Sequence, residues 1–209
     1  MQYSTKTHTF QPLTGIRILS LALNLPGPAA LLRCQQMGAH CTKLEPVAPA
    51  GTVSADPMHT YTPEGYHDLH APVHRLQANL KTAEGQALLH STLRNTDVLI
   101  TSFRPTALTK LGLEWEALSQ QYPRLNMVRI FGDARPEEAD HAGHDLTYQA
   151  QAGLTDTGHL PTSLFADMGG ALMVSEAVLQ TLLLRGQSEH GHCLDVGLFQ
   201  AAQWLALPR

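Results

Sequence analysis

The sequence has little of what a membrane-spanning, secreted or nucleic-acid-binding protein needs. None of its apolar runs reaches the ~20 residues that cross a bilayer. The N-terminal stretch MQYSTKTHTFQPL has no apolar core of the signal-peptide kind. The formal net charge is −4 and neither sign forms long runs, so we expect no basic surface for nucleic acid. The three cysteines, Cys34, Cys41 and Cys193, cannot all pair with one another, which favours reduced thiols and a cytoplasmic protein.

The sequence also lacks the glycine pattern of a dinucleotide-binding turn. A Rossmann domain that binds NAD or FAD has G-x-G-x-x-G after its first strand, followed by an acidic residue about 20 positions on. Glu45 lies 18 residues after Gly27, but the turn itself reads PGPAAL, with one glycine. We therefore expect no tightly bound nucleotide cofactor.

Histidine is abundant, but its spacing does not predict a metal site. The close sets among the twelve histidines are His67/His70, His141/His144 and His190/His192, the last followed by Cys193. No set lies beside a second cluster at a spacing known from zinc sites. Surface histidines are the simpler interpretation, and we expect no metal.

Apolar runs bounded by glycine or proline predict buried parallel strands that alternate with helices. The expected strands are Ile16–Leu21, Cys41–Glu45, Asp97–Thr101, Asn126–Phe131 and Leu194–Leu198, with a short further one at Leu76–Leu80. The expected helices are Ala29–Met37, Thr82–Thr92, Trp115–Gln121, Asp145–Ala152, Met168–Leu184 and Phe199–Leu207. Val47–Val73, rich in Pro, Gly, Thr and His, is expected to be a long surface loop. The alternation predicts an α/β fold with a doubly wound, mostly parallel sheet, formed by residues 12–209 after a flexible arm at 1–11.

Reactive side chains gather in the stretch Gly143–Gly170. His144 and Asp145 precede one expected helix, and Asp167 precedes the next. A histidine and two carboxylates at helix N-termini could move protons or attack a carbonyl group. From the residues alone, the alternative is that both aspartates are N-caps and that His144 satisfies a backbone carbonyl. Arg104 follows the Asp97–Thr101 strand, where it could meet a phosphate or be an ordinary surface arginine.

Five segments, in order, resemble CoA-transferase family III, which includes α-methylacyl-CoA racemase. They are MGAHCTKLEP, NLKTAEG, DVLITSFRPTALTKLGL, GHDLTYQAQAGL and LFADMGGALM, within a resemblance from PLTGIRILSLAL to LDVGLFQAA. The resemblance implies a Rossmann-like large domain and a coenzyme A thioester as substrate. Members of this family are usually close to twice this length. The chain would therefore match the N-terminal half, without the small domain.

The same resemblance implies roles for single residues. In the transferases, the aspartate matching Asp145 is the nucleophile that forms covalent intermediates with the acyl group and CoA. In the racemases, the residues matching His144 and Asp167 are the two acid–base groups on either side of the α-carbon. Because both are present, the resemblance favours racemase-like proton transfer on a 2-methylacyl-CoA over CoA transfer between carboxylic acids. The residues that it assigns to CoA binding are Glu45, Arg75, Ser102, Phe103 and Arg104.

Some segments depart from the family pattern. Residues 71–76 read APVHRL where the family has NRGKRS, which meets the nucleotide end of CoA, and the turn after Asn126–Phe131 reads GDARPEEAD. With the short length, these departures support an alternative: a truncated, catalytically degenerate relative that acts as a binding or partner-dependent subunit. The apolar terminal helix, with Trp204 and Leu207, predicts a homodimer or a partner chain that supplies the missing half.

Overall fold

The fold is a six-stranded parallel sheet with helices on both faces. The computed structural model describes residues 11–156 and 158–208, so the arm expected at 1–11 lies, except for Gln11, outside the described residues. The strands are β1 (Arg17–Ser20), β2 (His40–Glu45), β3 (His74–Gln77), β4 (Val98–Thr101), β5 (Asn126–Phe131) and β6 (Cys193–Gly197). They are arranged in the order β3-β2-β1-β4-β5-β6, and every pair is parallel. This confirms the predicted doubly wound sheet.

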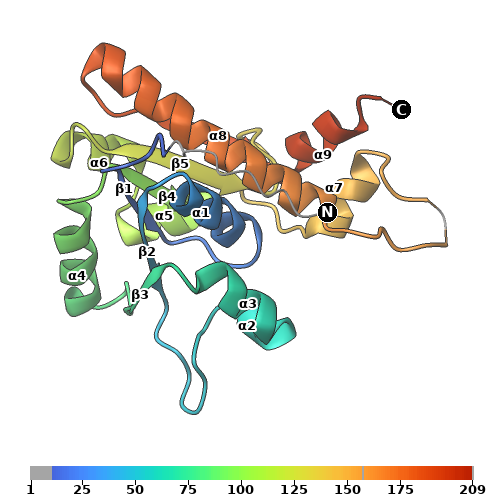
Figure 1. Cartoon of the computed structure of the whole chain (residues 1–209), viewed down its shortest axis with the longest axis horizontal. Helices are drawn as coiled ribbons and strands as arrows, with labels where there is room; N and C mark the ends of the chain where they lie inside the picture. The colour runs from blue at the N-terminus through green and yellow to red at the C-terminus, as the bar shows by residue number, and fades with distance from the viewer. Residues whose placement is uncertain (1–10, 157, 209) are drawn as a thin grey trace.

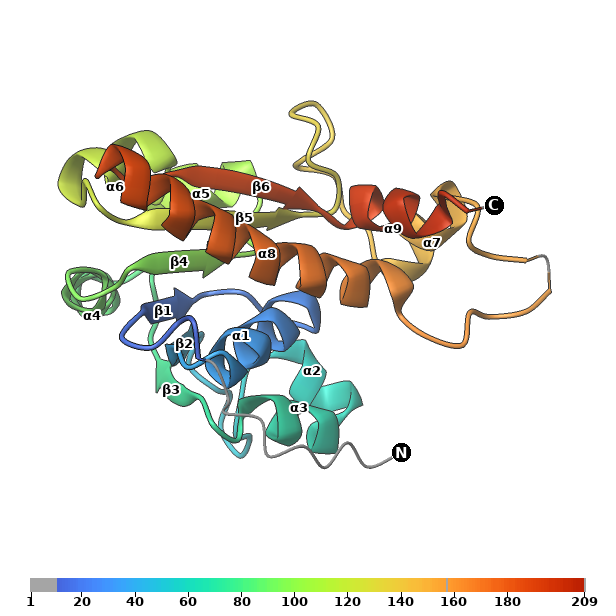
Figure 2. The same ribbon diagram turned by 45° about the horizontal axis from the view of Figure 1, so that its top comes forward.

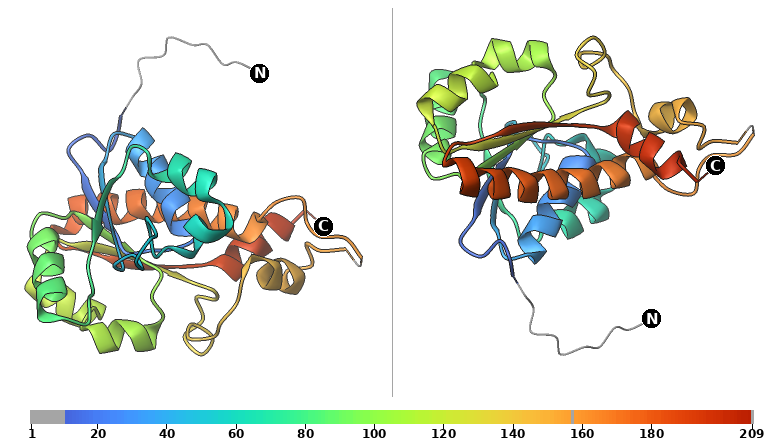
Figure 3. Two further views of the ribbon diagram at one scale, coloured as in Figure 1. Left: turned by 90° about the horizontal axis from the view of Figure 1, so that it is seen from below. Right: turned by 90° about the horizontal axis from the view of Figure 1, so that it is seen from above.

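Helices form a layer on each face of this sheet (Figure 1; Figure 3). The longer ones are α1 (Pro26–Gln36), α4 (Ala83–Leu93), α8 (Phe165–Ser188) and α9 (Leu198–Ala206). The shorter ones are α2 (Pro57–Tyr61), α3 (Pro63–His70), α5 (Pro105–Leu111), α6 (Trp115–Gln121) and α7 (Asp145–Gln151). Helices α1 and α8 cover one face, and α4, α5 and α6 cover the other. Figure 2 shows α7 and α9 beyond the carboxyl ends of β5 and β6.

The strands are buried on both sides, because successive side chains point to opposite faces. Ile18, Ile100 and Val128 belong to the apolar cluster under α1 and α8. Their neighbours Leu19, Leu99 and Met127 belong to the cluster under α4, α5 and α6. This explains why the strands appear in the sequence as nearly continuous apolar runs.

Helix α8 is the central packing element of its face. Among the described residues it is the helix that is long and apolar enough to cross a membrane, by length and composition only. It packs against α1, β5 and α9, and Val174, Ala177 and Val178 are buried there. This contact with the sheet accounts for its apolar side.

The expectation of a long loop at 47–73 is wrong, because α2 and α3 lie within it. Helix α5 was not expected either, and α1 begins at Pro26 rather than Ala29. All four helices have a proline in the first two positions. A proline is well tolerated there, because the N–H that it lacks would have no partner within the helix. Strand β3 ends at Gln77, before most of the expected Leu76–Leu80.

The strand order reverses between β1 and β4, and ligands of such sheets bind outside the carboxyl ends of the strands at this point. The two turns are joined there, since the Leu23 backbone N–H donates to Ser102 Oγ at 3.3 Å. Helix α1 comes close to the end of β1 at Gly27. A Cβ on Gly27 would lie 2.2 Å from the Ala22 Cβ, so this approach requires glycine.

Candidate functional site

Asp145 and Asp167 come together at the N-termini of α7 and α8. Asp145 is the first residue of α7, and only 5% of it is exposed. Its Oδ1 accepts the backbone N–H of Asp167 at 2.9 Å, and its Oδ2 accepts the Gln149 side-chain amide. Helix α8 has no side-chain cap of its own at Leu164. Asp145 therefore satisfies an N–H group of the first turn of α8 from a different helix, instead of capping its own.

Asp167 is held in a state in which it readily carries a proton. Burial, and then the charge of Asp145, raise the pKa of Asp167 to about 7. A carboxyl group with a pKa near the working pH suits general acid–base chemistry. Its carboxyl oxygens accept no hydrogen bond that the structure shows among the described residues, so they are available to a substrate.

Tyr148 and Arg104 share the electrostatic environment of Asp167. Burial raises the pKa of Tyr148, as does the charge of Asp167, whereas Arg104 lowers it. The Tyr148 ring lies against Gly132 and Gly143. A Cβ on either glycine would lie 2.5 Å or less from the phenol oxygen. These glycines leave room for the hydroxyl, and the β4–α5 turn brings Arg104 towards Tyr148.

His144 is exposed, unlike Asp167, its predicted acid–base partner. It is the N-cap residue of α7, is exposed, and makes no side-chain capping bond. Its carbonyl accepts the Thr147 N–H at 2.8 Å, but its ring makes no hydrogen bond among the described residues. The structure thus joins Asp145 to Asp167 directly and leaves the imidazole of His144 free on the rim.

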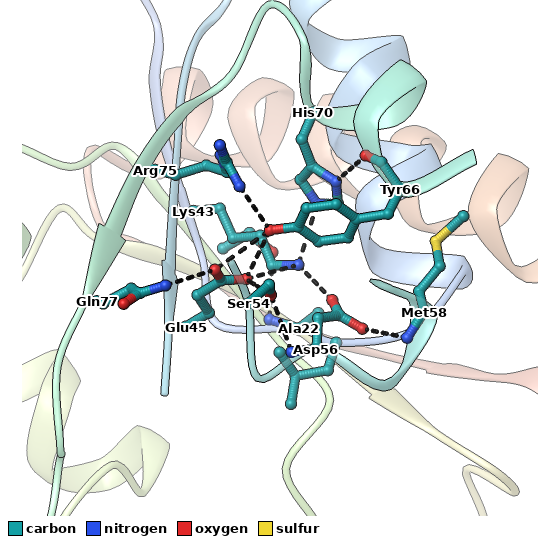
Figure 4. Close-up of polar contacts among 12 residues, drawn as sticks. Ala22, Lys43, Glu45, Ser54, Asp56, Met58, Tyr66, His70, Arg75 and Gln77 are labelled. Carbon is teal, nitrogen blue, oxygen red and sulfur yellow. Dashed lines mark hydrogen bonds and ion pairs between the residues drawn. The ribbon is translucent and has the colours of Figure 1, made fainter. Parts of the chain in front are cut away.

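A buried polar cluster lies at the carboxyl ends of β2 and β3 (Figure 4). It consists of Lys43, Glu45, Ser54, Asp56, Tyr66 and His70, which are all buried. Lys43 Nζ bonds Asp56 Oδ2, lies 3.0 Å from His70 Nε2 and lies 3.5 Å from Glu45 Oε2. The ammonium group thus has two hydrogen-bond partners and a second carboxylate nearby, and these compensate its buried charge.

His70 is neutral in this cluster. Its Nδ1 lies 2.6 Å from the Tyr66 carbonyl oxygen, so Nδ1 donates and Nε2 accepts from Lys43. Burial, and then the charge of Lys43, lower the pKa of His70 to about 4. Asp56 joins the cluster to the turn after β1, because its Oδ1 accepts the backbone N–H of Asn24. The same oxygen accepts the Met58 N–H in the first turn of α2. The cluster thus fixes the α2–α3 segment beside the switch point of the sheet.

Two residues predicted to bind CoA belong to this cluster or its rim. Glu45 is 1% exposed, and its carboxylate accepts hydrogen bonds from Ser54, Tyr66 and Gln77. Arg75 is exposed and donates to the Tyr66 hydroxyl at 3.0 Å. The Arg75 side chain is accessible to a ligand, whereas protein groups enclose the Glu45 carboxylate. Ser102 and Phe103 lie at the switch point, on the turn before Arg104.

Sequence reasoning missed Lys43, Asp56, Tyr66, His70, Tyr148 and Gln149. One available signal was Lys43 itself, a charge inside the otherwise apolar strand CTKLE. A buried charge needs partners, but the sequence does not say which residues of 47–73 supply them. Gln149 follows Asp145 by four residues, a spacing that places two side chains on one helix face.

Many unrelated proteins share an α/β fold of this kind, so the fold does not identify the family of this chain. Comparison with known proteins does. The family model of CoA-transferase family III matches residues 13–209, so the chain belongs to this family. It is 31% identical to succinyl-CoA–D-citramalate CoA-transferase of Chloroflexus aurantiacus over 91% of the chain and 50% of that protein. It is 26% identical to human alpha-methylacyl-CoA racemase over 93% of the chain and 50% of the racemase.

A solved structure matches the fold as well. The CAIB/BAIF family protein from Brucella suis superposes with a TM-score of 0.80 at 27% identity, over 93% of this chain and 55% of that one. The chain thus spans about half the length of the relatives that it matches.

Proposed function

We propose that the chain is an acyl-CoA-handling part of a family III protein, in which Asp167 is the central reactive group. The observation that carries this proposal is the pKa of Asp167, raised to about 7 by burial and by Asp145. A carboxyl group in that range can give or accept a proton at neutral pH. The position of the acidic pair beyond the carboxyl edge of a family III sheet supports a CoA thioester as its substrate.

In the racemase-like version, Asp167 and His144 exchange the α-proton of a 2-methylacyl-CoA. The α-proton of a thioester is weakly acidic, so the enolate needs stabilisation as it forms. Backbone N–H groups at a helix N-terminus supply it without a metal. The free carboxyl group of Asp167 and the free imidazole of His144 support this version.

In the transferase-like version, a carboxylate attacks the thioester carbonyl and the CoA thiolate leaves. The attacking group must be deprotonated, and it is a better nucleophile when its oxygens accept no hydrogen bonds. Both oxygens of Asp145 accept one, whereas Asp167, with a pKa of about 7, is partly ionised at neutral pH and accepts none among the described residues. The geometry therefore favours Asp167 over Asp145 as the nucleophile, with Asp145 holding α8 in place.

We further propose that CoA lies along the switch point, near Ser102, Phe103 and Arg104, with Arg75 at the far rim. Arginine binds phosphate groups well because its planar donors match their geometry. Both arginines are exposed: Arg104 follows the carboxyl end of β4, and Arg75 lies on β3 beside the Tyr66 hydroxyl of the buried polar cluster. The three free thiols support a cytoplasmic location.

Two parallel incubations distinguish the racemase-like from the transferase-like reaction. The chain is mixed with a 2-methylacyl-CoA in heavy water, and in parallel with an acyl-CoA and an isotopically labelled free acid. Mass spectrometry then follows deuterium at the α-carbon and label in the thioester. Deuterium exchange that is lost in both His144→Ala and Asp167→Asn supports the racemase-like version. Transfer of the label that is lost in Asp167→Asn but kept in His144→Ala supports the transferase-like version. If neither product forms but the chain still binds CoA, the result supports a non-catalytic binding subunit.

The non-catalytic alternative has an observation of its own in its favour. Large apolar side chains are exposed on α8 and α9 and just after α9, among them Leu172, Leu183, Trp204 and Leu207. Exposed apolar patches of this kind mark interfaces. A second copy, or a partner chain that supplies what the longer relatives carry, would cover them.

A further inference from the structure

A cavity lies at the amino ends of the strands, away from the acidic pair of Asp145 and Asp167. It has a volume of about 350 Å³, and β1, β2 and β3 line it together with the end of α4. Arg17, His40, Thr42 and His74 come from the strands, and Thr92 and Asn95 from α4 and the turn after it. In Figure 2, α4 and β1 lie on the opposite side of the molecule from α7 and α9.

The strand register brings the polar side chains onto one face. Arg17 pairs with His40, and His74 pairs with Thr42, and directly paired residues point to the same side of a sheet. Further along this face the side chains become apolar and buried, as at Leu19 and Leu44. Helix α4 ends at Leu93 and leaves the first strand residues uncovered. The side chains on this face of the sheet are therefore polar where α4 no longer covers them.

The polar side chains of the cavity have donors without partners. The imidazoles of His40 and His74 and the hydroxyl of Thr42 make no hydrogen bond among the described residues. Arg17 makes long contacts, with Nε 3.7 Å from Asp97 Oδ2 and Nη1 3.5 Å from Asn95 Oδ1. Asp97 is also paired with Arg185 at 3.1 Å, so two guanidinium groups share its charge.

The lining contains no carboxylate within the part of the chain that the structure describes. A merely solvated end of a sheet would account for polar side chains, but it does not require that three nitrogen-bearing groups converge on one cavity, where the carboxylate that Arg17 contacts, that of Asp97, is shared with Arg185. Guanidinium and imidazole N–H groups are good partners for phosphate oxygens. The volume lies at the lower end of the range for small-molecule sites.

We propose that this cavity binds a small phosphate-bearing anion through Arg17, His40 and His74. The site is separate from the acidic pair, because it lies at the amino ends of the strands. It does not depend on the chemistry proposed for Asp167. Its ligand is an inorganic phosphate or a small phosphate ester, and two arms of the experiment distinguish these sources.

The test is a titration of the ¹⁵N-labelled chain with inorganic phosphate, against sodium chloride at matched ionic strength. We expect saturable amide shifts around Arg17, His40 and His74, and none around Asp145 and Asp167. A parallel titration with glycerol 3-phosphate that saturates at lower concentration identifies an ester as the better ligand. Shifts that never saturate, or that are equal with chloride, would overturn the proposal.

Variants then localise the site. His40→Ala/His74→Ala should weaken phosphate binding at least tenfold, because each change removes the imidazole N–H donor to the anion. Lys110→Gln, an exposed lysine on α5, is the control for loss of positive charge and should leave the affinity unchanged. Both histidines are exposed and lack partners, so their loss should not unfold the chain. Unchanged affinity in the double variant, or displacement of phosphate from this cavity by CoA, would refute a separate site. If the double variant fails to fold, the wild-type shift map decides alone.

Discussion

The Asp145 carboxylate accepts the backbone N–H of Asp167 at 2.9 Å, so one member of the acidic pair caps the helix that carries the other. This arrangement holds the two carboxyl groups close together while it leaves only the Asp167 side chain without a partner. Burial disfavours the ionised form of Asp167, and the charge of Asp145 adds to this effect. Together they raise the pKa of Asp167 to about 7.

This pKa has a consequence for stability. An acid whose pKa is higher in the folded than in the unfolded chain binds its proton more tightly when folded. Its contribution to stability therefore falls as pH rises from about 3.8 to about 7. Asp167→Asn should stabilise the protein at pH 8, by about 1–4 kcal/mol, and change little near pH 4. Urea unfolding at both pH values measures this, with the exposed Asp68→Asn as control. An equal effect of Asp167→Asn at both pH values would contradict it.

The buried polar cluster makes Lys43 the most sensitive charge in the fold. Removing one partner of a buried ion pair leaves the other charge unpaired. Lys43→Met should cost about 3–5 kcal/mol, since Glu45 and Asp56 would remain buried without their counter-charge. Denaturant unfolding checks this, and Lys81→Met, at an exposed lysine, serves as the control. A cost for Lys43→Met as small as that of the control would mean that the carboxylates are compensated in another way.

His70 makes the same cluster sensitive to acid. Its pKa is lowered to about 4, so the folded chain binds this proton less tightly than the unfolded chain does. Its contribution to stability is complete above about pH 6.5 and is lost as pH falls towards 4. His70→Gln should therefore flatten the stability profile between pH 6.5 and 4, measured by thermal unfolding. The exposed His67→Gln is the matched control, and identical profiles for the two variants would exclude this role.

The sequence was sufficient for a doubly wound parallel sheet, because that prediction depends on local patterns, and it named Asp145 and Asp167 as candidates. It did not predict that Asp145 caps the helix of Asp167, because that contact joins two helices. Buried parallel strands appear as apolar runs, as Ile18–Ser20 and Val98–Thr101 do. Proline misled the helix predictions, because at Pro26, Pro57, Pro63 and Pro105 it begins a helix instead of breaking one. The buried polar cluster could not be predicted, since Lys43 meets Asp56 and His70 only through tertiary packing.

Arg104 tests the proposed CoA site. Charge-assisted hydrogen bonds to a phosphate are worth about 1–3 kcal/mol, so Arg104→Ala should weaken CoA binding roughly tenfold or more. Isothermal titration calorimetry measures the affinity. Lys110→Ala removes a charge from the same helix region and should have a much smaller effect. Unchanged affinity in Arg104→Ala would reject this contact but leave the acidic pair untouched.

The exposed apolar side of α9 leads to the last prediction, that the chain does not work as a monomer. Trp204 on α9 is 69% exposed, and Leu207, directly after this helix, is 67% exposed. Two-fold pairing is the commonest way to cover such a surface, so we expect a homodimer of twice the 22.8 kDa chain mass. Light scattering on dilute protein measures the mass. Trp204→Glu/Leu207→Glu should give monomers, whereas the control Val53→Glu, in the loop before α2, should not change the mass. A wild-type chain that stays a soluble monomer at low micromolar concentration would contradict both the homodimer and a partner chain on this surface.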